Sequence, residues 1–513
     1  MDAALLDAQE LSAAPRAGGN ALPHEALLML LQLLPLDARA RAACVCRAWR
    51  AAASHTDMWA ELSFTHCAAR IDDATLAALC ARAGAALRTL DLEAAACTCV
   101  TAAGMVVALR DGGCSGVRRL NMPLLHGVPF MTRAITAEMA EELSTACRVL
   151  ERAACAGSCG ISDVAAVLTA LPGLHMLDCD CIGDLTPLTE CLRNNATLTA
   201  LSLSWSQNGD AGVTQLAECL GVISSLRNLE LTSIGVSEAG CTKLAEYLRV
   251  NTTLEFLDLR DNNIGDVGTA QLADCLCVNA TLRTLLLCRN DIGEAGATQL
   301  AGCLRVNATL KYLDLSENVI GNTGATQLAE CLHVNTTLTS LDLYDNGIVD
   351  EGVTLVVDCL RANTTLLSLD LGSNDINEYD MTEFAQCVGY NATLTSLYLC
   401  GNVIGDEAAT RLAECLCVNS TLEILDLSYN CICKEGTMEL IECLRVNTTL
   451  TCLNLQYNDD IGCGFSVEDA TRLADCLRVN GKLTSLNLED NHFDAAAEGA
   501  LRAACPPNCT LQI

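Results

Sequence analysis

The sequence predicts an α/β solenoid in which short parallel strands line a curved inner face and helices cover the outside. A 28-residue unit recurs through the second half of the chain, as in "LEFLDLRDNNIGDVGTAQLADCLCVNAT". One asparagine occupies the same place in each unit, at Asn262, Asn290, Asn318, Asn346, Asn374, Asn402, Asn430 and Asn458. A fixed period of this length is typical of repeat architectures, in which each unit packs only against its neighbours.

The composition fits such a stack. Of 513 residues, 51% are hydrophobic and 3% aromatic, which predicts a layered core of Leu, Ala, Val and Cys. The formal charge is −32, so nucleic acid and anionic membrane surfaces would be repelled and a protein partner is favoured. The start "MDAALLDAQE" lacks the basic and apolar segments of a signal peptide, and we expect a cytoplasmic location, a nuclear one, or both.

The first predicted elements lie before the repeats, in residues 21–64. Apolar residues from Leu22 onward are spaced for a helix that ends at Pro35, and a second helix is predicted after it. Two of the three tryptophans, Trp49 and Trp59, fall in this stretch. Their concentration is informative in a chain with so few aromatic residues.

Each repeat then predicts a strand, a turn and a helix. The pattern "LxxLxL" alternates like a short strand, and Ala297, Leu300 and Leu304 form the apolar stripe of a helix. About fifteen units are expected. The strand leucines are Leu90, Leu120, Leu150, Leu177, Leu201, Leu229, the 28-residue series from Leu257 to Leu453, and Leu486. Leu62 precedes Leu90 by 28 residues, so the first repeat is expected to follow the helical stretch without a linker.

The 33 cysteines do not indicate a disulfide scaffold. Many recur every 28 residues on one helix face, from Cys275 to Cys443. Parallel helices pack roughly 8–10 Å apart, whereas a disulfide needs Cα atoms within about 7 Å. We therefore expect free, buried thiols.

Nine N-x-[ST] sequons also follow the period, from Asn195 to Asn447. Without a signal peptide, a structural role is favoured over glycosylation. The asparagines fall where each helix turns into the next strand, and we expect them in the left-handed conformation that asparagine tolerates.

The repeats resemble the leucine-rich repeat of the ribonuclease-inhibitor type, whose pattern is "LxxLxLxxNxIgxxGaxxLaxxL". This resemblance implies a parallel sheet on the concave face, helices outside, and asparagine side chains that bond successive turns as a ladder. Ile234 replaces the ladder asparagine in one unit, and an insertion around "DDIGCGFS" interrupts another.

The stretch before the repeats resembles an F-box, a small all-helical domain. The pattern Leu-Pro-x-Glu, Leu-Pro, Val-Cys-x-x-Trp and a final Trp is matched in order across about forty residues. The resemblance implies docking onto the Skp-type adaptor of a cullin–RING ubiquitin ligase. The adaptor-binding residues would be Leu22, Pro23, Glu25, Leu28, Val45, Cys46 and Trp49. The alternative is a helical cap that closes the end of the solenoid.

These patterns divide the chain into five predicted parts. They are a disordered tail (1–19), the F-box (20–62), irregular repeats (63–200), regular repeats (201–491) and a C-terminal cap (492–513).

The strand residues beside the core leucines are predicted to form the target-binding face, because side chains alternate along a strand. Aromatic candidates are Phe256, Tyr312, Tyr344, Tyr398, Tyr429 and Tyr457, and acidic candidates are Asp258, Asp314, Asp342, Asp370 and Asp426. Three of these aspartates would form an unbroken carboxylate row, which predicts a basic target. The alternatives are that tyrosine tolerates a half-exposed strand and that "LDL" is ordinary in such repeats.

No catalytic, cofactor or metal motif is found, and the histidines are scattered. The favoured function is the substrate-recognition subunit of an SCF-type ubiquitin ligase, which supplies proximity and no reactive group. A binding scaffold or inhibitor of the ribonuclease-inhibitor type is the main alternative. A third is activation of a GTPase such as Ran, for which Arg260 or Arg289 would have to act from the rim.

Overall fold

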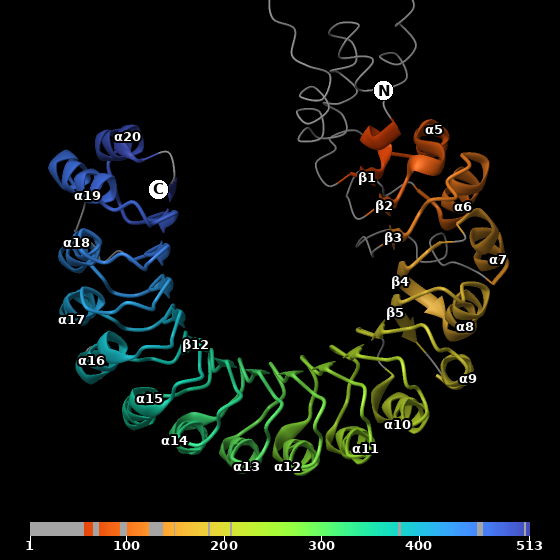
Figure 1. Ribbon diagram of the computed structural model, residues 1–513, viewed down its shortest axis with the longest axis horizontal. Helices are drawn as coiled ribbons and strands as arrows, with labels where there is room; N and C mark the ends of the chain where they lie inside the picture. The colour runs from red at the N-terminus through yellow and green to blue at the C-terminus, as the bar shows by residue number, and fades with distance from the viewer. Residues whose placement is uncertain are drawn as a thin grey trace, which may run out of the picture. The chain divides into compact units, whose positions relative to one another are not determined.

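The computed structural model describes residues 56–64, 71–92, 100–122, 137–147, 149–182, 185–205, 208–377, 381–458, 465–506 and 509–513. These residues alternate between short strands and helices (Figure 1). The chain divides into two compact units, one of Met1–Asn208 with Glu218–Glu230 and one of Gly209–Ala217 with Leu231–Ile513. Helix α10 (Gly209–Leu220) lies at the division.

The first unit contains seven described strands, which pair in parallel from β1 to β7. The strands are β1 (Glu61–Ser63), β2 (Thr89–Asp91), β3 (Arg119–Met122), β4 (Arg152–Gly160), β5 (Met176–Ile182), β6 (Ala200–Ser202) and β7 (Asn228–Glu230). The helices are η2 (Thr56–Trp59), α5 (Asp73–Ala83), η3 (Gly84–Ala86), α6 (Ala102–Asp111), α7 (Ala137–Ala146), α8 (Ile161–Ala170) and α9 (Thr186–Arg193).

The second unit is a regular stack whose strands line the inside of a curve and whose helices form the outside (Figure 1). Its strands are β8 (Phe256–Asp258), β9 (Thr284–Leu286), β10 (Tyr312–Asp314), β11 (Ser340–Asp342), β12 (Ser368–Asp370), β13 (Ser396–Tyr398), β14 (Ile424–Asp426), β15 (Cys452–Asn454), β16 (Ser485–Asn487) and β17 (Thr510–Gln512). Its helices are α11 (Glu238–Leu248), α12 (Gly265–Leu276), α13 (Glu294–Leu304), α14 (Gly321–Leu332), α15 (Asp350–Ala362), α16 (Met381–Tyr390), α17 (Asp406–Leu416), α18 (Lys434–Cys443), α19 (Val467–Val479) and α20 (Ala495–Ala504).

Strand register follows the sequence period. Each central leucine of the second unit pairs with the one a unit away, as Leu285 does with Leu313. In the first unit Leu62 of β1 pairs with Leu90 of β2, so β1 is the first described strand of the sheet. The direct junction with the preceding helical stretch stays a prediction, because that stretch lies outside the described residues. The strand assignment at Leu150 was wrong. Ala153 pairs with Leu120 instead, and Leu150 is a buried residue that precedes β4.

The core consists of stacked leucines and small residues, as the composition predicts. The central strand leucines from Leu257 to Leu486 and the helix stripe of Ala297, Leu300 and Leu304 are at most 2% exposed. The cysteines among the described residues are free, and most of the helix column is buried. Burial raises the pKa of the Cys331 thiol to about 12, so it stays protonated and behaves as an apolar group.

The predicted asparagine ladder is present at the turns after β8 to β16 of the second unit. The Asn318 Nδ2 group donates to the carbonyl of Leu287, one unit back, at 3.0 Å. Its Oδ1 atom accepts from the backbone N–H groups of Asn290 and Ile292, both at 3.0 Å. Each side chain thereby satisfies buried backbone groups of the preceding turn. Where Ile234 replaces the asparagine, its side chain is buried in the core.

A second asparagine ladder lies at the helix exits, where the sequons are. Asn335 is 5% exposed, and its Nδ2 group donates to the Leu304 carbonyl of the preceding unit at 2.7 Å. Its Oδ1 atom accepts from the N–H groups of Thr337 and Leu338. Asn480 is followed by "GK" and is no sequon, yet it makes equivalent bonds. The column is therefore structural.

The expected left-handed conformation of these asparagines was wrong. Asn363 has φ −72° and ψ 131°, and Asn480 has φ −78° and ψ 115°, which is extended backbone. The left-handed residues lie elsewhere, directly before the first ladder, as at Glu317 and Asp345. The hydrogen bonds of the side chain, not the backbone tolerance of asparagine, explain its recurrence at the helix exits.

The last residues extend the repeat pattern. Helix α20 is followed by β17, whose Leu511 pairs with Leu486 of β16. The sequence placed the last strand at Leu486, so the segment predicted as a cap contains one further strand. Within the described residues no helix is long and apolar enough to cross a membrane.

Candidate functional site

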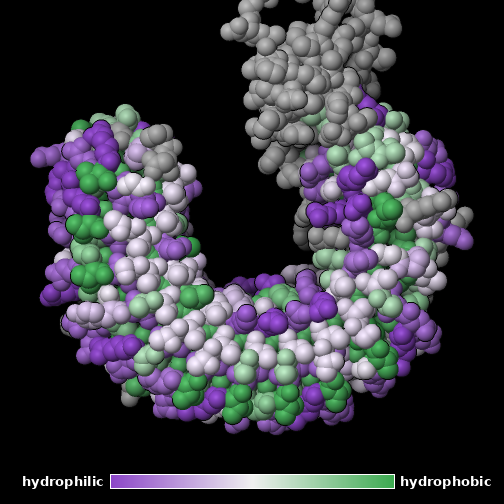
Figure 2. All heavy atoms as spheres, in the orientation of Figure 1, coloured by the Kyte–Doolittle hydropathy of each residue, from purple (hydrophilic) through white to green (hydrophobic). Residues whose placement is uncertain are grey.

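The candidate site is the strand face of the second unit, on the inside of its curve. Hydrophilic residues gather along part of this inner edge (Figure 2). Three positions of each unit line this face: the residue before the central leucine, the residue after it, and the third residue after it. Most of the side chains at these positions are buried or half-buried. The leucines between them point into the core.

The predicted carboxylate row is confirmed by the strand register. Asp314 of β10 pairs with Asp342 of β11, which pairs with Asp370 of β12. Tyr398 of β13 follows, and Asp426 of β14 pairs with it. Four carboxylates and one tyrosine thus occupy the same position of five consecutive strands.

Each aspartate of the row also has a local structural role. Its Oδ1 atom accepts a hydrogen bond from the backbone N–H two residues later, at 3.0 Å from Tyr344 to Asp342 and at 2.8 Å from Gly372 to Asp370. Asn454 accepts the equivalent bond from Gln456 at 3.2 Å. The fold therefore requires an acceptor at this position but does not require a negative charge.

The middle of the row carries carboxylates that are hard to ionise. Burial raises the pKa of Asp342 to about 7 against the lowering effect of the Tyr344 N–H, and Asp370 and Asp314 raise it further. Burial raises the pKa of Asp370 to about 6, with further contributions from Asp426 and Asp314. Burial and the neighbouring carboxylates also raise the pKa of Tyr312 to about 12. A cation bound here would relieve this accumulated negative charge.

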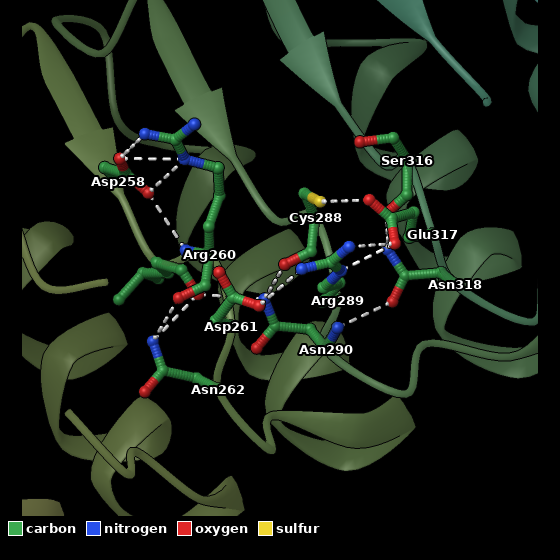
Figure 3. A network of polar contacts seen from close by, with 11 residues as sticks. Asp258, Arg260, Asp261, Asn262, Cys288, Arg289, Asn290, Ser316, Glu317 and Asn318 are labelled. Carbon is green, nitrogen blue, oxygen red and sulfur yellow. Dashed lines mark hydrogen bonds and ion pairs between the residues drawn. The ribbon is translucent and has the colours of Figure 1, made fainter. Parts of the chain in front are cut away.

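One end of the inner face is already neutralised by arginine (Figure 3). Asp258 is 1% exposed, and the Arg260 guanidinium donates to both of its carboxylate oxygens, with Nη2 2.6 Å from Oδ2. Arg289 contacts Glu317 at 2.6 Å and Asp261 at 3.5 Å. Both arginines proposed for a GTPase-activating role are thus engaged by carboxylates, which gives that function no support.

The aromatic candidates are distributed along the same face. Phe256 and Tyr312 begin β8 and β10, Tyr398 ends β13, and Tyr344 follows β11; all four are half-buried. Tyr429 and Tyr457 lie at the rim and stack on each other, with ring centroids 4.7 Å apart and 12° between the planes. Target binding by the aromatic and acidic candidates stays a prediction.

The predicted adaptor-binding residues lie outside the described residues. They are Leu22, Pro23, Glu25, Leu28, Val45, Cys46 and Trp49. Trp59, the last tryptophan of the same pattern, is described and is 4% exposed. The Arg82 guanidinium of α5 lies 4.3 Å from the centre of its ring. The end of the helical stretch is therefore packed onto the first repeat helix.

Two features of the face were missed in the sequence. The pairing of Asp258 with Arg260 could have been found, because residues two apart on a strand share one side. The left-handed backbone of Tyr429 and Tyr457 at the rim could not, because it depends on contacts between neighbouring units. Among the described residues, no group of three or more His, Cys, Asp or Glu side chains is arranged to hold a metal ion.

Comparison with family models identifies both parts of the chain. Residues 20–65 match the F-box-like model. The Leucine Rich repeat model matches seven times, at residues 250–273, 306–329, 334–357, 362–378, 390–413, 418–440 and 446–462. The chain carries an F-box-like domain followed by leucine-rich repeats. This confirms the family resemblance and the fold class of the F-box and leucine-rich-repeat chain.

Three solved structures are distantly similar to the chain. The Rad7 and Elc1 complex in yeast is 20% identical, with 73% of this chain and 86% of that chain covered and a TM-score of 0.44. An internalin (InlF) from Listeria monocytogenes is 19% identical over 73% of this chain and 88% of its own, at a TM-score of 0.38. Leiomodin-1 actin-binding site 2 is 20% identical, with 31% of this chain and 88% of that chain covered and a TM-score of 0.26. No curated protein matches the chain. These values carry no argument about function.

Proposed function

We propose that this F-box and leucine-rich-repeat chain is the substrate-recognition subunit of an SCF-type cullin–RING ubiquitin ligase. The F-box would dock the Skp-type adaptor, and the inner face of the repeats would bind the target protein. The chain would hold the target near the transferring enzyme and contribute proximity in place of a reactive group.

The observation that carries this proposal is the presence of the two parts in one chain. The F-box-like match ends at residue 65 and includes β1, whose Leu62 pairs in parallel with Leu90 of β2. The match therefore overlaps the first described strand, and the adaptor-binding and target-binding parts belong to one chain. Such a chain favours the transfer of a group onto a bound target, because it brings the target near the transferring enzyme.

The test is capture of a purified Skp-type adaptor by the intact chain and by a Leu22→Ala/Pro23→Ala variant. We expect the intact chain to retain the adaptor and the double variant to lose at least about tenfold in affinity, since apolar anchors dominate such interfaces. Leu367→Ala is the matched control, because Leu367 is an exposed leucine of the repeats at 44% exposure. An intact chain that captures no adaptor would leave a binding scaffold or inhibitor as the function.

A basic target is the second part of the proposal. The row of Asp314, Asp342, Asp370 and Asp426 supports it, because the fold needs a hydrogen-bond acceptor at these positions and not a charge. The pKa values of Asp342 and Asp370, raised first by burial and then by neighbouring carboxylates, support it as well, because they mark charges that are costly to form on this face. Basic side chains of a target would offset this cost.

A further inference from the structure

The stacked tyrosines at the rim of the second unit are not explained by the fold. Tyr429 is 54% exposed and Tyr457 is 49% exposed, although both are large aromatic residues. Both adopt the left-handed conformation, with φ 54°. This conformation is unusual for bulky residues and is readily met by glycine, asparagine or aspartate. A pair of tyrosines here therefore points to a role at the surface.

The same position in neighbouring units shows what the backbone accepts. The residue directly before the ladder asparagine is left-handed in unit after unit, and it is Glu317, Asp345, Ser373, Gly401, Tyr429, Tyr457 and Asp490 in turn. Backbone hydrogen bonds link these neighbours, from the Gly401 N–H to the Ser428 carbonyl and from the Tyr429 N–H to the Gln456 carbonyl. The column is therefore continuous, and the side chains in it lie side by side.

Gly401 contributes no side chain to the column next to Tyr429. Tyr457 stacks against one side of the Tyr429 ring, and the neighbour on the other side has no side chain. Beyond Gly401 stands Ser373, whose Oγ atom would lie 2.7 Å from a Cβ atom at position 401. We use the word slot for the position beside Gly401 in this column, between Tyr429 and Ser373. Its neighbours are one aromatic ring and one hydrogen-bonding group.

The surroundings of the slot are negative. Cys400, next to Gly401, has a pKa raised to about 12 by burial and then by Asp426, Asp370 and Asp342. Burial raises the pKa of Tyr398 as well, and Asp370 and Asp426 add to this effect against a hydrogen bond with Ser396. Three carboxylates of the row thus act on the residue beside the slot. Arg260, a cation on the same face, is already bound by Asp258.

We propose that this slot binds the guanidinium group of an arginine in an extended, basic segment of the target protein. The planar guanidinium would stack on the Tyr429 ring and donate to the Ser373 hydroxyl. Neighbouring basic residues of the segment would lie over the carboxylate row. A lysine would be attracted to the carboxylates but would stack poorly on the Tyr429 ring, because its ammonium group is compact and strongly hydrated. The inference rests on the proposed function in that the inner face receives a target protein.

The test measures binding of three labelled nine-residue peptides to the full chain. The peptides share a Gly and Ser background and carry two arginines, two lysines or two citrullines. We expect the arginine peptide to bind more tightly than the lysine peptide, and the citrulline peptide to bind weakest because it is planar but uncharged. Tyr429→Ser should weaken arginine-peptide binding by roughly three- to thirtyfold, the range of a cation–π contact, and lysine-peptide binding by less.

The chain offers matched variants for this test. Ser373 already occupies the equivalent backbone position with φ 52°, so Tyr429→Ser is expected to fold. Tyr429→Phe should preserve arginine binding, because it keeps the aromatic ring. Tyr390→Ser is the control, because Tyr390 is 84% exposed at the end of helix α16.

Equal binding of the arginine and lysine peptides, no effect of Tyr429→Ser, or no binding of any basic peptide would each overturn the inference. Adaptor capture depends on residues of the F-box and gives a separate result. If the chain selects the arginine peptide but captures no adaptor, the ligase role is rejected and the arginine-binding proposal is kept. If the chain captures the adaptor but does not distinguish the peptides, only the arginine-binding proposal is rejected.

Discussion

At the scale of single residues, the aspartates of the inner face combine a structural role with an electrostatic cost. Asp342 accepts a backbone hydrogen bond that Asn454 accepts equally well in another unit. Its negative charge is therefore surplus to the fold. Asp314, Asp370 and Glu317 face it and raise its pKa further after burial has done so. The charge destabilises the folded protein, and this effect can be measured.

We predict that Asp342→Asn stabilises the protein at pH 8 and has little effect at pH 4. The folded-state pKa is about 7, above the usual value of 3.8, so the folded protein binds more protons between these values. Stability contributed by this residue therefore falls as pH rises from about 4 through 7. The gain at pH 8 should be about 1–3 kcal/mol, given about 1.4 kcal/mol for each pKa unit and partial exposure.

Urea unfolding at several pH values provides the measurement. Asp358→Asn, on the outside of α15, is the control, because the side chain of Asp358 is 49% exposed and its ion pair with Arg361 is long, at 3.8 Å. The explanation fails if wild type and Asp342→Asn show parallel stability curves across this pH range.

At the scale of elements, the helix exits are held by asparagine side chains that reach the preceding unit. Asn335 bonds the end of α14 to the carbonyl of Leu304 at the end of α13 and also caps the chain that enters β11. A residue of this kind fixes both the spacing of adjacent helices and the start of the next strand. These two roles explain why the asparagine recurs at the helix exits from Asn251 to Asn480.

We predict that Asn335→Ala destabilises the second unit by about 2–4 kcal/mol, because it leaves one buried carbonyl and two N–H groups without a partner. Thr337→Ala should cost much less. It abolishes the N-x-[ST] pattern but keeps the Thr337 N–H, which donates to Asn335 at 3.0 Å. Thermal unfolding of both variants separates the two roles. A loss of similar size in Thr337→Ala would contradict the ladder as the reason for the motif.

At the scale of the whole molecule, the repeat could be predicted because a hydrogen bond that recurs in each unit requires the same residue type at the same position of each unit. The Asn318 ladder contacts repeat from unit to unit, so the sequence shows them directly. The strand at β4 was misplaced because Ala153 occupies the leucine position, and alanine gives no strand signal. The slot at Gly401 could not be predicted, since it depends on left-handed backbone conformations that arise only from contacts between units.

The charge of −32 then predicts opposite effects of salt on stability and on binding. Added salt screens repulsion among 63 acidic residues, so the unfolding temperature should rise between about 50 and 500 mM NaCl. Binding of the arginine peptide should weaken over the same range, because its attraction to the carboxylate row is screened. Thermal unfolding and peptide titration on the same samples measure both. Because salt is expected to stabilise the folded protein, a loss of peptide affinity at high salt could not be caused by unfolding. A peptide affinity that stays constant with salt would show that charge does not hold the basic segment on this face.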